Sequence, residues 1–290
     1  MFSSLFRPSK PNVPSNNQNN SNSSLSLKNK KALCVGINDY PGTHNDLRGC
    51  VNDAKIWERI LNENYQYNVL TLFDRRATVK RFLEIMGNYI SDSKSGDYIA
   101  ITFSGHGTQV EDTSGDEKDD LDEAFCMYDG LVIDDDIRYM LKSLNKEAHL
   151  TVIADCCHSG TITRSFLSAM NQENIYHRPR YMPPSDEKII SLNKKVYGEK
   201  PKHIFKPEEE MQEILLSGCL SHEYSYDAFL GGMFRGAMSY FATEALERSP
   251  FLTYEEFHNE ILKNLPSSRY PQTPQLEGAE TNKNKNVFRF

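Results

Sequence analysis

The stretch Tyr98-Ile-Ala-Ile-Thr-Phe-Ser-Gly-His-Gly107 is a run of apolar and β-branched residues that ends in a polar, glycine-containing turn. The stretch His149-Leu-Thr-Val-Ile-Ala-Asp-Cys-Cys-His-Ser-Gly160 has the same arrangement. Short runs of this kind are typical of parallel strands that are buried on both faces. We therefore expect His106 and Cys157 at the carboxyl ends of neighbouring strands, where open α/β sheets bind their ligands.

Strand-like and helix-like patterns alternate along the rest of the chain. Strands are expected at 32–37, 68–73, 98–103, 149–154 and 213–217, and helices at 47–63, 78–91, 135–144, 236–248 and 254–264. Thr253 and Glu256 have the spacing of a capping box at the start of the last helix. The alternation predicts an α/β fold: a mostly parallel central sheet with helices on both faces, in three layers.

Two segments depart from this alternation. Residues 1–29 are rich in Asn, Ser and Pro, a composition that cannot bury enough surface to order itself, and we expect a disordered leader. Residues 30–290 are expected to form one folded domain. Within it, residues 161–211 contain five prolines and many basic side chains, which predicts a long basic surface loop.

Composition excludes several classes of protein. The formal net charge is −7, which argues against non-specific nucleic-acid binding and is compatible with basic partners. No apolar stretch approaches the ~20 residues needed to cross a bilayer, and the first residues lack the apolar core of a secretory signal. The six cysteines are scattered rather than arranged as disulfide staples, so we expect a reducing, cytoplasmic setting without a membrane.

The chemistry predicted at the two strand ends is that of a cysteine hydrolase. Cys157 would attack a carbonyl as a thiolate, and His106, 51 residues earlier, would accept the thiol proton and later protonate the leaving group. Cys156 should point to the opposite face, and His158 is too close in sequence to face Cys157. A zinc site of these three consecutive residues is disfavoured, because they cannot supply tetrahedral ligands without strain.

Both boxes resemble the catalytic boxes of the metacaspases, caspase-like cysteine peptidases. The resemblance extends in order and spacing from Lys31 to Glu277, through Ala32-Leu-Cys-Val-Gly-Ile-Asn-Asp-Tyr40, Leu47-Arg-Gly-Cys-Val-Asn-Asp-Ala54 and Gln272-Thr-Pro-Gln-Leu276. It implies a caspase-like fold and an endopeptidase that acts on proteins or peptides, works as a monomer and needs no organic cofactor.

The resemblance also implies individual roles. The backbone N–H groups of Gly107 and Cys157 would hold the oxyanion. Asp155 and Asp53, with Ser104 and Cys50 beside them, would line the primary pocket. Two buried carboxylates require a cationic guest, so we expect cleavage after Arg or Lys. Cleavage after Asp would need basic residues in the pocket, and the sequence suggests none there.

A cluster of acidic residues raises the question of calcium. Such a run is usually a solvated loop, but many metacaspases depend on calcium, and the resemblance assigns ligands to Asp122, Asp134 and Asp135. A fourth expected ligand position is Arg164, which would repel the metal.

The basic loop carries nine residues that match the expected preference of the chain's own pocket: Arg164, Arg178, Arg180, Lys188, Lys194, Lys195, Lys200, Lys202 and Lys206. Self-cleavage in the loop is one interpretation, and an uncut basic lid over the acidic cleft is the other. Two alternatives to a peptidase are also open: a caspase-like scaffold that binds partners without turnover, and a cysteine hydrolase of non-peptide amides or esters.

Overall fold

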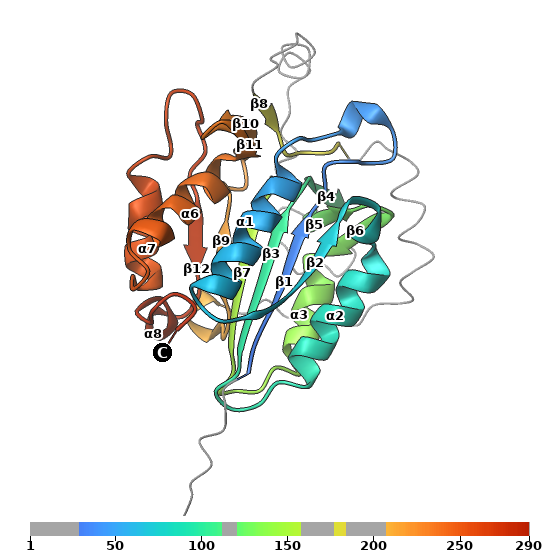
Figure 1. Ribbon diagram of the computed structural model, residues 1–290. Helices are drawn as coiled ribbons and strands as arrows, with labels where there is room; N and C mark the ends of the chain where they lie inside the picture. The colour runs from blue at the N-terminus through green and yellow to red at the C-terminus, as the bar shows by residue number, and fades with distance from the viewer. Residues whose placement is uncertain (1–28, 112–120, 158–176, 184–206, 290) are drawn as a thin grey trace, which may run out of the picture.

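The computed structural model describes residues 29–111, 121–157, 177–183 and 207–289, and its centre is a six-stranded sheet. The sheet has the order β12-β9-β7-β3-β1-β2. Its strands are β1 (Lys30–Gly36), β2 (Asn68–Phe73), β3 (Tyr98–Ser104), β7 (His149–Asp155), β9 (Ile214–Ser217) and β12 (Gln275–Glu277). The first five are parallel and β12 is antiparallel to β9 (Figure 1). The expected α/β sheet is confirmed.

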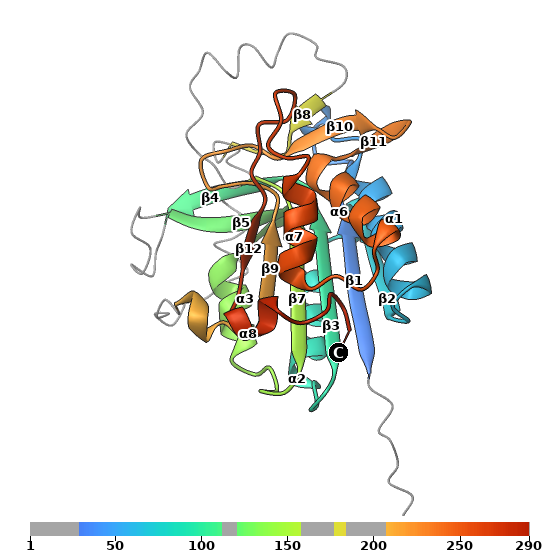
Figure 2. The same cartoon turned by 90° about the vertical axis from the view of Figure 1, so that its left-hand side faces the viewer.

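Helices cover both faces of the sheet, because parallel strands need crossover connections. One face carries α1 (Cys50–Glu63), α6 (Ala237–Arg248) and α7 (Tyr254–Leu262), and the other carries α2 (Val79–Ser91) and α3 (Asp134–Leu141) (Figures 1 and 2). The capping box of Thr253 and Glu256 is present at the start of α7. The three expected layers are therefore formed, with helix ends within three residues of those expected.

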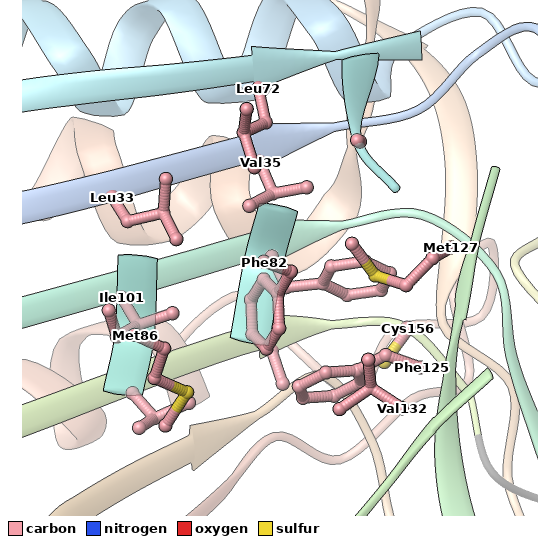
Figure 3. Packing of buried hydrophobic residues seen from close by; sticks show 14 of the residues in the cluster. Leu33, Val35, Leu72, Phe82, Met86, Ile101, Phe125, Met127, Val132 and Cys156 are labelled. Carbon is pink, nitrogen blue, oxygen red and sulfur yellow. The ribbon is translucent and has the colours of Figure 1, made fainter. Parts of the chain in front are cut away.

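The core lies in two layers that follow strand alternation. Leu33 and Ile101 pack with Phe82 and Met86 of α2 on one face (Figure 3). On the opposite face, Ala32 and Ala100 belong to a second cluster, which contains these side chains from the helices: Trp57, Met238, Phe257. Successive strand residues thus point to opposite helix layers, and both faces of the sheet are buried.

Several short elements were not expected from the sequence. An antiparallel sheet of β4 (Gly107–Glu111), β5 (Leu121–Met127) and β6 (Gly130–Ile133) follows the His106 turn. Another joins β8 (His177–Pro179), β10 (Tyr226–Leu230) and β11 (Met233–Gly236), and a short helix, α8, spans Glu280–Lys283. Apart from β5, these elements span three to five residues, too few for their alternation to stand out. Both sheets lie near the carboxyl ends of β3 and β7 (Figure 1).

The expected basic surface loop is wrong for residues 177–183. Residues 177–183 include β8 and three buried side chains: Arg180, Tyr181 and Met182. Arg180 has no exposed surface. Residues 207–210 of the loop are exposed. The remaining residues of that loop, apart from 211, and the expected leader, apart from residue 29, lie outside the described residues. Among the residues that the structure does describe, no helix is long and apolar enough to span a membrane.

Phe82 tests the packing under α2. Its side chain is fully buried and meets Phe125 edge-on, with ring centroids 6.4 Å apart. We expect Phe82→Ala to lower the free energy of unfolding by about 3–5 kcal/mol, because it removes apolar burial and leaves a cavity. Urea unfolding followed by circular dichroism measures this. The matched control Phe251→Ala, at a side chain that is 68% exposed, should lower it by less than about 1 kcal/mol; equal effects would contradict the packing.

Candidate active site

The register of β3 and β7 brings the two boxes together. Ser104 pairs with Asp155 in neighbouring parallel strands, and each strand ends there. His106 and Cys157 each lie two residues further on. The backbone N–H groups of Gly107 and Cys157 donate to one and the same atom, the carbonyl oxygen of Arg180, over 3.0 and 3.1 Å. The two turns therefore form a pair of N–H donors around a single oxygen.

The imidazole of His106 is buried, and its contacts define its tautomer. Nε2 lies 2.7 Å from the backbone oxygen of Asn45, which only accepts, so Nε2 carries the hydrogen. Nδ1 is then the basic nitrogen, and it is buried without a hydrogen-bond partner. The hydroxyl of Tyr40 accepts from the His106 N–H at 2.9 Å and donates to the Cys126 carbonyl at 3.1 Å, which holds the turn in place.

Burial lowers the pKa of His106 to about 3. The hydrogen bond to Asn45 raises this pKa, and the positive charges of Arg178 and Arg180 lower it further. The ring is consequently neutral at physiological pH while Arg180 is in place. A neutral imidazole with a free Nδ1 is suited to accept a proton.

The thiol of Cys157 is also fully buried, and the backbone of Ser225 holds it. The Ser225 N–H donates to Sγ at 2.7 Å, and Sγ donates to the Ser225 carbonyl at 3.2 Å. That carbonyl also accepts from the Arg180 N–H at 2.9 Å, so the thiol lies beside residue 180. Cys156 packs in the cluster under α2 instead, so the two cysteines point to different faces.

The guanidinium of Arg180 occupies an acidic pocket. One terminal nitrogen lies 2.6 Å from Asp53 and 3.0 Å from Asp227, and the other lies 3.2 Å from the Asp155 carboxylate. The second nitrogen also donates to the Asp155 carbonyl at 3.1 Å. All four side chains are buried. A buried cation is tolerated only when it is paired and hydrogen-bonded in this way.

Backbone donors from other elements hold the three carboxylates. Asp155 accepts from the Ser239 N–H at 2.9 Å and from the Ser225 hydroxyl. Asp53, on α1, accepts from the Gly236 N–H at 2.8 Å. Asp227, on β10, accepts from the backbone N–H groups of residues 48 and 49, at 2.8 and 2.9 Å. The pocket is thus preformed by α1, β7, β10 and the start of α6.

Two charged residues of the pocket were missed from the sequence. Asp227 is the third carboxylate, and its position after Ser225-Tyr226 carries no local signal of a pocket. Arg235 corrects the expectation that no basic residue lies there, because its Nε is 3.3 Å from Asp53 and its side chain is buried. Three carboxylates therefore face two buried arginines, and Arg235 stays beside Asp53 when Arg180 is absent.

The other expected pocket residues are close to this network. Cys50 is buried on the first turn of α1, and its thiol interacts electrostatically with Arg180. Ser104 is buried at the end of β3, opposite Asp155. Gly236 leaves the space that the guanidinium needs, because a Cβ there would lie 2.1 Å from the Asp155 carboxylate and 2.3 Å from Arg180.

Burial raises the pKa of Asp53 to about 6. The Arg180 guanidinium, followed by the weaker influence of Arg235, lowers this pKa, and the charge of Asp155 raises it. The ionised form of Asp53 therefore depends on a cation in the pocket. By linkage, a cationic side chain must bind the pocket more tightly when Asp53 is ionised than when Asp53 is protonated.

The residues expected to bind calcium lie where β5 and β6 meet α3. Asp122 and Asp135 are buried, and one carboxylate oxygen each of Asp134 and Asp135 is buried without a hydrogen-bond partner. Burial raises the pKa of Asp134 to about 7, Arg138 lowers it, and three neighbouring acids raise it. The described residues contain no group of three or more His, Cys, Asp or Glu side chains placed to hold a metal. They fit calcium only in part, and Arg164 lies outside them.

Comparison with known proteins supports the family relationship. The profile of the metacaspase, peptidase C14 domain matches residues 30–165. Metacaspase-1 from Candida glabrata is 30% identical over 96% of this chain and 79% of its own length. Metacaspase-1 from Kluyveromyces lactis is 30% identical over 90% of this chain and 68% of its own length. A solved structure from Geobacter sulfurreducens matches with a TM-score of 0.69 at 25% identity, covering 90% of this chain and 98% of that one. The chain belongs to the metacaspase family of C14 cysteine peptidases.

Proposed function

We propose that this protein is a cysteine endopeptidase that cleaves after arginine or lysine, with Cys157 as nucleophile and His106 as general base and acid. The observation that carries the proposal is the position of Arg180. Its carbonyl oxygen accepts from both predicted oxyanion donors while its guanidinium is bound by three carboxylates. A substrate residue before a scissile bond needs these two interactions at once.

The proposed reaction follows from these contacts. Nδ1 of His106 takes the thiol proton, and the N–H of Ser225 continues to donate to the sulfur. The thiolate attacks the carbonyl carbon, and the developing oxyanion is held by the N–H groups of Gly107 and Cys157. A donor of this kind contributes roughly 3–4 kcal/mol in other enzymes. The imidazolium then protonates the leaving amine, and water hydrolyses the thioester.

Charge supports the proposed specificity. Once the pocket is free of Arg180, three buried carboxylates face Arg235, and an acidic guest would add a fourth negative charge in a low dielectric. A guanidinium reaches all three carboxylates because its donors form a planar fork, whereas an ammonium is a point charge. We expect arginine to be preferred over lysine on this ground.

The alternatives have less support. A scaffold without turnover would not need a neutral His106 and a thiol that accepts from a backbone N–H after the ends of two neighbouring strands. A hydrolase of non-peptide amides would not need three carboxylates and a neighbouring antiparallel strand, β10, at the pocket. The proposal includes a monomer in a reducing, cytoplasmic setting, and the six buried cysteines, none of which forms a disulfide, agree with that setting.

Peptide hydrolysis tests the nucleophile and the specificity together. We expect the wild type to cleave fluorogenic peptides ending in arginine at least 10²-fold faster than those ending in aspartate, since an unpaired buried charge costs several kcal/mol. Cys157→Ala should abolish cleavage, and His106→Ala should lower kcat by roughly 10²–10⁴-fold. Preference for aspartate would contradict the specificity, and full activity of Cys157→Ala would contradict the mechanism.

The raised pKa of Asp53 predicts a pH dependence of binding. The pKa of about 6 applies while the Arg180 guanidinium lowers it, and without a cation in the pocket the pKa of Asp53 is higher. KM for arginine peptides should therefore rise several-fold as the pH falls towards about 6 and level off below it, where Asp53 is protonated with and without the peptide. Asp53→Asn lacks this titration and should show a flatter profile with a higher KM throughout. The same pH slope in both proteins would exclude Asp53 as its source.

Calcium activation is a separate part of the proposal, and no catalytic step is assigned to the metal. A bound cation would neutralise the acids around Asp134 and Asp135 and lower the raised pKa of Asp134. We expect millimolar calcium, compared with excess chelator, to raise both the melting temperature and the rate of peptide hydrolysis. Asp135→Asn should lose both responses. Identical melting temperature and rate in calcium and chelator would rule calcium out.

A further inference from the structure

We propose that Cys219 is a redox partner of Cys157, and that a small hydroperoxide converts the two thiols into a disulfide that switches the peptidase off reversibly. The inference rests on the proposed function, because Cys157 is the same nucleophile. It adds a modification site to the catalytic thiol and gives a role to a cysteine that the peptide-bond mechanism does not use.

The first observation is where the two cysteines follow their strands. β7 and β9 are neighbouring parallel strands, and their last pair is Ala154 with Ser217. The Gly218 N–H donates to the Ala154 carbonyl at 2.8 Å, so the two chains stay together beyond that pair. Cys157 follows the end of β7 by two residues, and Cys219 follows the end of β9 by two residues. Both thiols therefore lie at the same edge of the sheet, after adjacent strands (Figure 1).

The second observation is that the two thiols are in contact. Cys157 and Cys219 belong to one small buried cluster, together with Tyr181. A hydrogen bond of the Cys219 thiol to Cys157 raises the pKa of Cys219, and burial raises it further. The Cys219 sulfur also lies 3.5 Å from the Glu223 carbonyl oxygen and 3.8 Å from that of Cys156, and both oxygens accept from the thiol. Cys219 is therefore a protonated thiol that lies against the sulfur of Cys157.

The third observation separates Cys219 from the other cysteines. Among the six cysteines, all of which lie in the described residues, only Cys219 shares a cluster with Cys157. The remaining four belong to the two layers of the core: Cys34, Cys50, Cys126 and Cys156. Cys156 is next to the nucleophile in sequence, but its side chain packs under α2 (Figure 3). The fold therefore selects one partner for the catalytic sulfur.

The backbone suits a disulfide between these two positions. A disulfide needs Cα atoms about 4.4–6.8 Å apart, and neighbouring strands lie about 4.8 Å apart. Residues that follow the ends of two paired strands by the same number of positions meet this condition while the two chains stay paired. A bond between the sulfurs of Cys157 and Cys219 therefore leaves the sheet intact.

The oxidation balances with the hydroperoxide as the only other reactant. His106 takes the proton of Cys157, and the thiolate attacks one oxygen of the O–O bond. That bond breaks, Cys157 becomes a sulfenic acid, and the other oxygen leaves with the proton from His106 as an alcohol, or as water from hydrogen peroxide. The Cys219 sulfur then attacks the sulfenic sulfur, so that the S–S bond forms and the S–O bond breaks. The hydroxide leaves with the Cys219 proton as water.

The proposed active site supplies what each step needs. Only a thiolate reacts readily with a hydroperoxide, and the mechanism already provides one at Cys157. A site that admits a peptide carbonyl to this sulfur also admits a molecule as small as hydrogen peroxide. Because the Cys219 thiol already lies beside Cys157, its attack on the sulfenic acid has the advantage of an intramolecular reaction.

The disulfide has two consequences for the enzyme. A sulfur bonded to Cys219 cannot attack a carbonyl, so hydrolysis stops until a dithiol reduces the bond by exchange. The disulfide also keeps the sulfenic acid from further oxidation to a sulfinic acid, which dithiols do not reverse. Disulfides that form in a reducing compartment are usually transient and redox-sensing, which agrees with a switch of this kind.

Mass spectrometry of the full-length wild type tests the bond itself. After treatment with hydrogen peroxide and blocking of free thiols, a tryptic digest should contain the peptides of Cys157 and Cys219 joined, two hydrogen atoms lighter than the separate peptides. Dithiothreitol should remove this pair. Cys156→Ala, which leaves one cysteine in the first peptide, should give the same pair. Absence of the pair, or a link from Cys157 to a different cysteine, would overturn the proposal.

Recovery of activity tests the role of the bond. Peroxide should stop hydrolysis of the arginine peptide by the wild type, and dithiothreitol should restore nearly all of it. Cys219→Ser cannot form the disulfide, so its nucleophile is oxidised further, and we expect it to recover roughly 10-fold less of its starting activity. The matched control Cys34→Ala, with its substitution in β1, should recover as the wild type does. Equal recovery by Cys219→Ser and the wild type would contradict the switch.

The two measurements separate this inference from the proposed function. If the untreated wild type hydrolyses the arginine peptide but peroxide yields no link between Cys157 and Cys219, the inference is wrong and the proposed function stands. If the untreated wild type leaves the peptide intact and still forms the link, the proposed function is wrong and the modification site stands.

Discussion

The ion pairing between Arg180 and three buried aspartates is the constraint that organises this active site. A charge removed from water costs several kcal/mol unless it is compensated, so none of the four groups is stable in this place alone. Asp53 comes from α1, Asp155 from β7 and Asp227 from β10. The guanidinium therefore links elements far apart in the chain, and its departure leaves a pocket whose charge selects the next cation.

The sheet places the catalytic groups around that pocket. β3 and β7 end in register, and the two turns after them supply the imidazole, the thiol and a pair of N–H donors. The surrounding contacts are mainly backbone: Asn45 orients His106, and Ser225 holds the thiol and accepts from residue 180. Gln272 holds the segment that follows Ser225. Its side-chain oxygen accepts from the Tyr226 N–H, and its side-chain nitrogen donates to the Gly218 carbonyl. Backbone groups cannot rotate away, so the site is rigid before a substrate arrives.

Local sequence patterns were sufficient for the central sheet and for the two catalytic boxes. The runs at 98–103 and 149–154 are long enough to be recognised as buried strands, and the polar residues after them follow at the sheet edge. Asp227 and Arg235 were beyond such reasoning, because their roles arise from contacts between distant positions of the chain. Asp227 accepts from the N–H groups of residues 48 and 49, and Arg235 contacts Asp53. Arg180 was one of nine basic residues in the loop, and only the fold shows which of them reaches the carboxylates.

The central claim is that residue 180 lies in the active site as a substrate does, and a crystal structure of the full-length Cys157→Ala variant tests it most directly. The backbone N–H at position 157 is retained in this variant, so both oxyanion donors are present. The account predicts the Arg180 carbonyl oxygen within hydrogen-bonding distance of both N–H groups, with its guanidinium between Asp53, Asp155 and Asp227. An empty pocket, or a different basic side chain in it, would contradict the account.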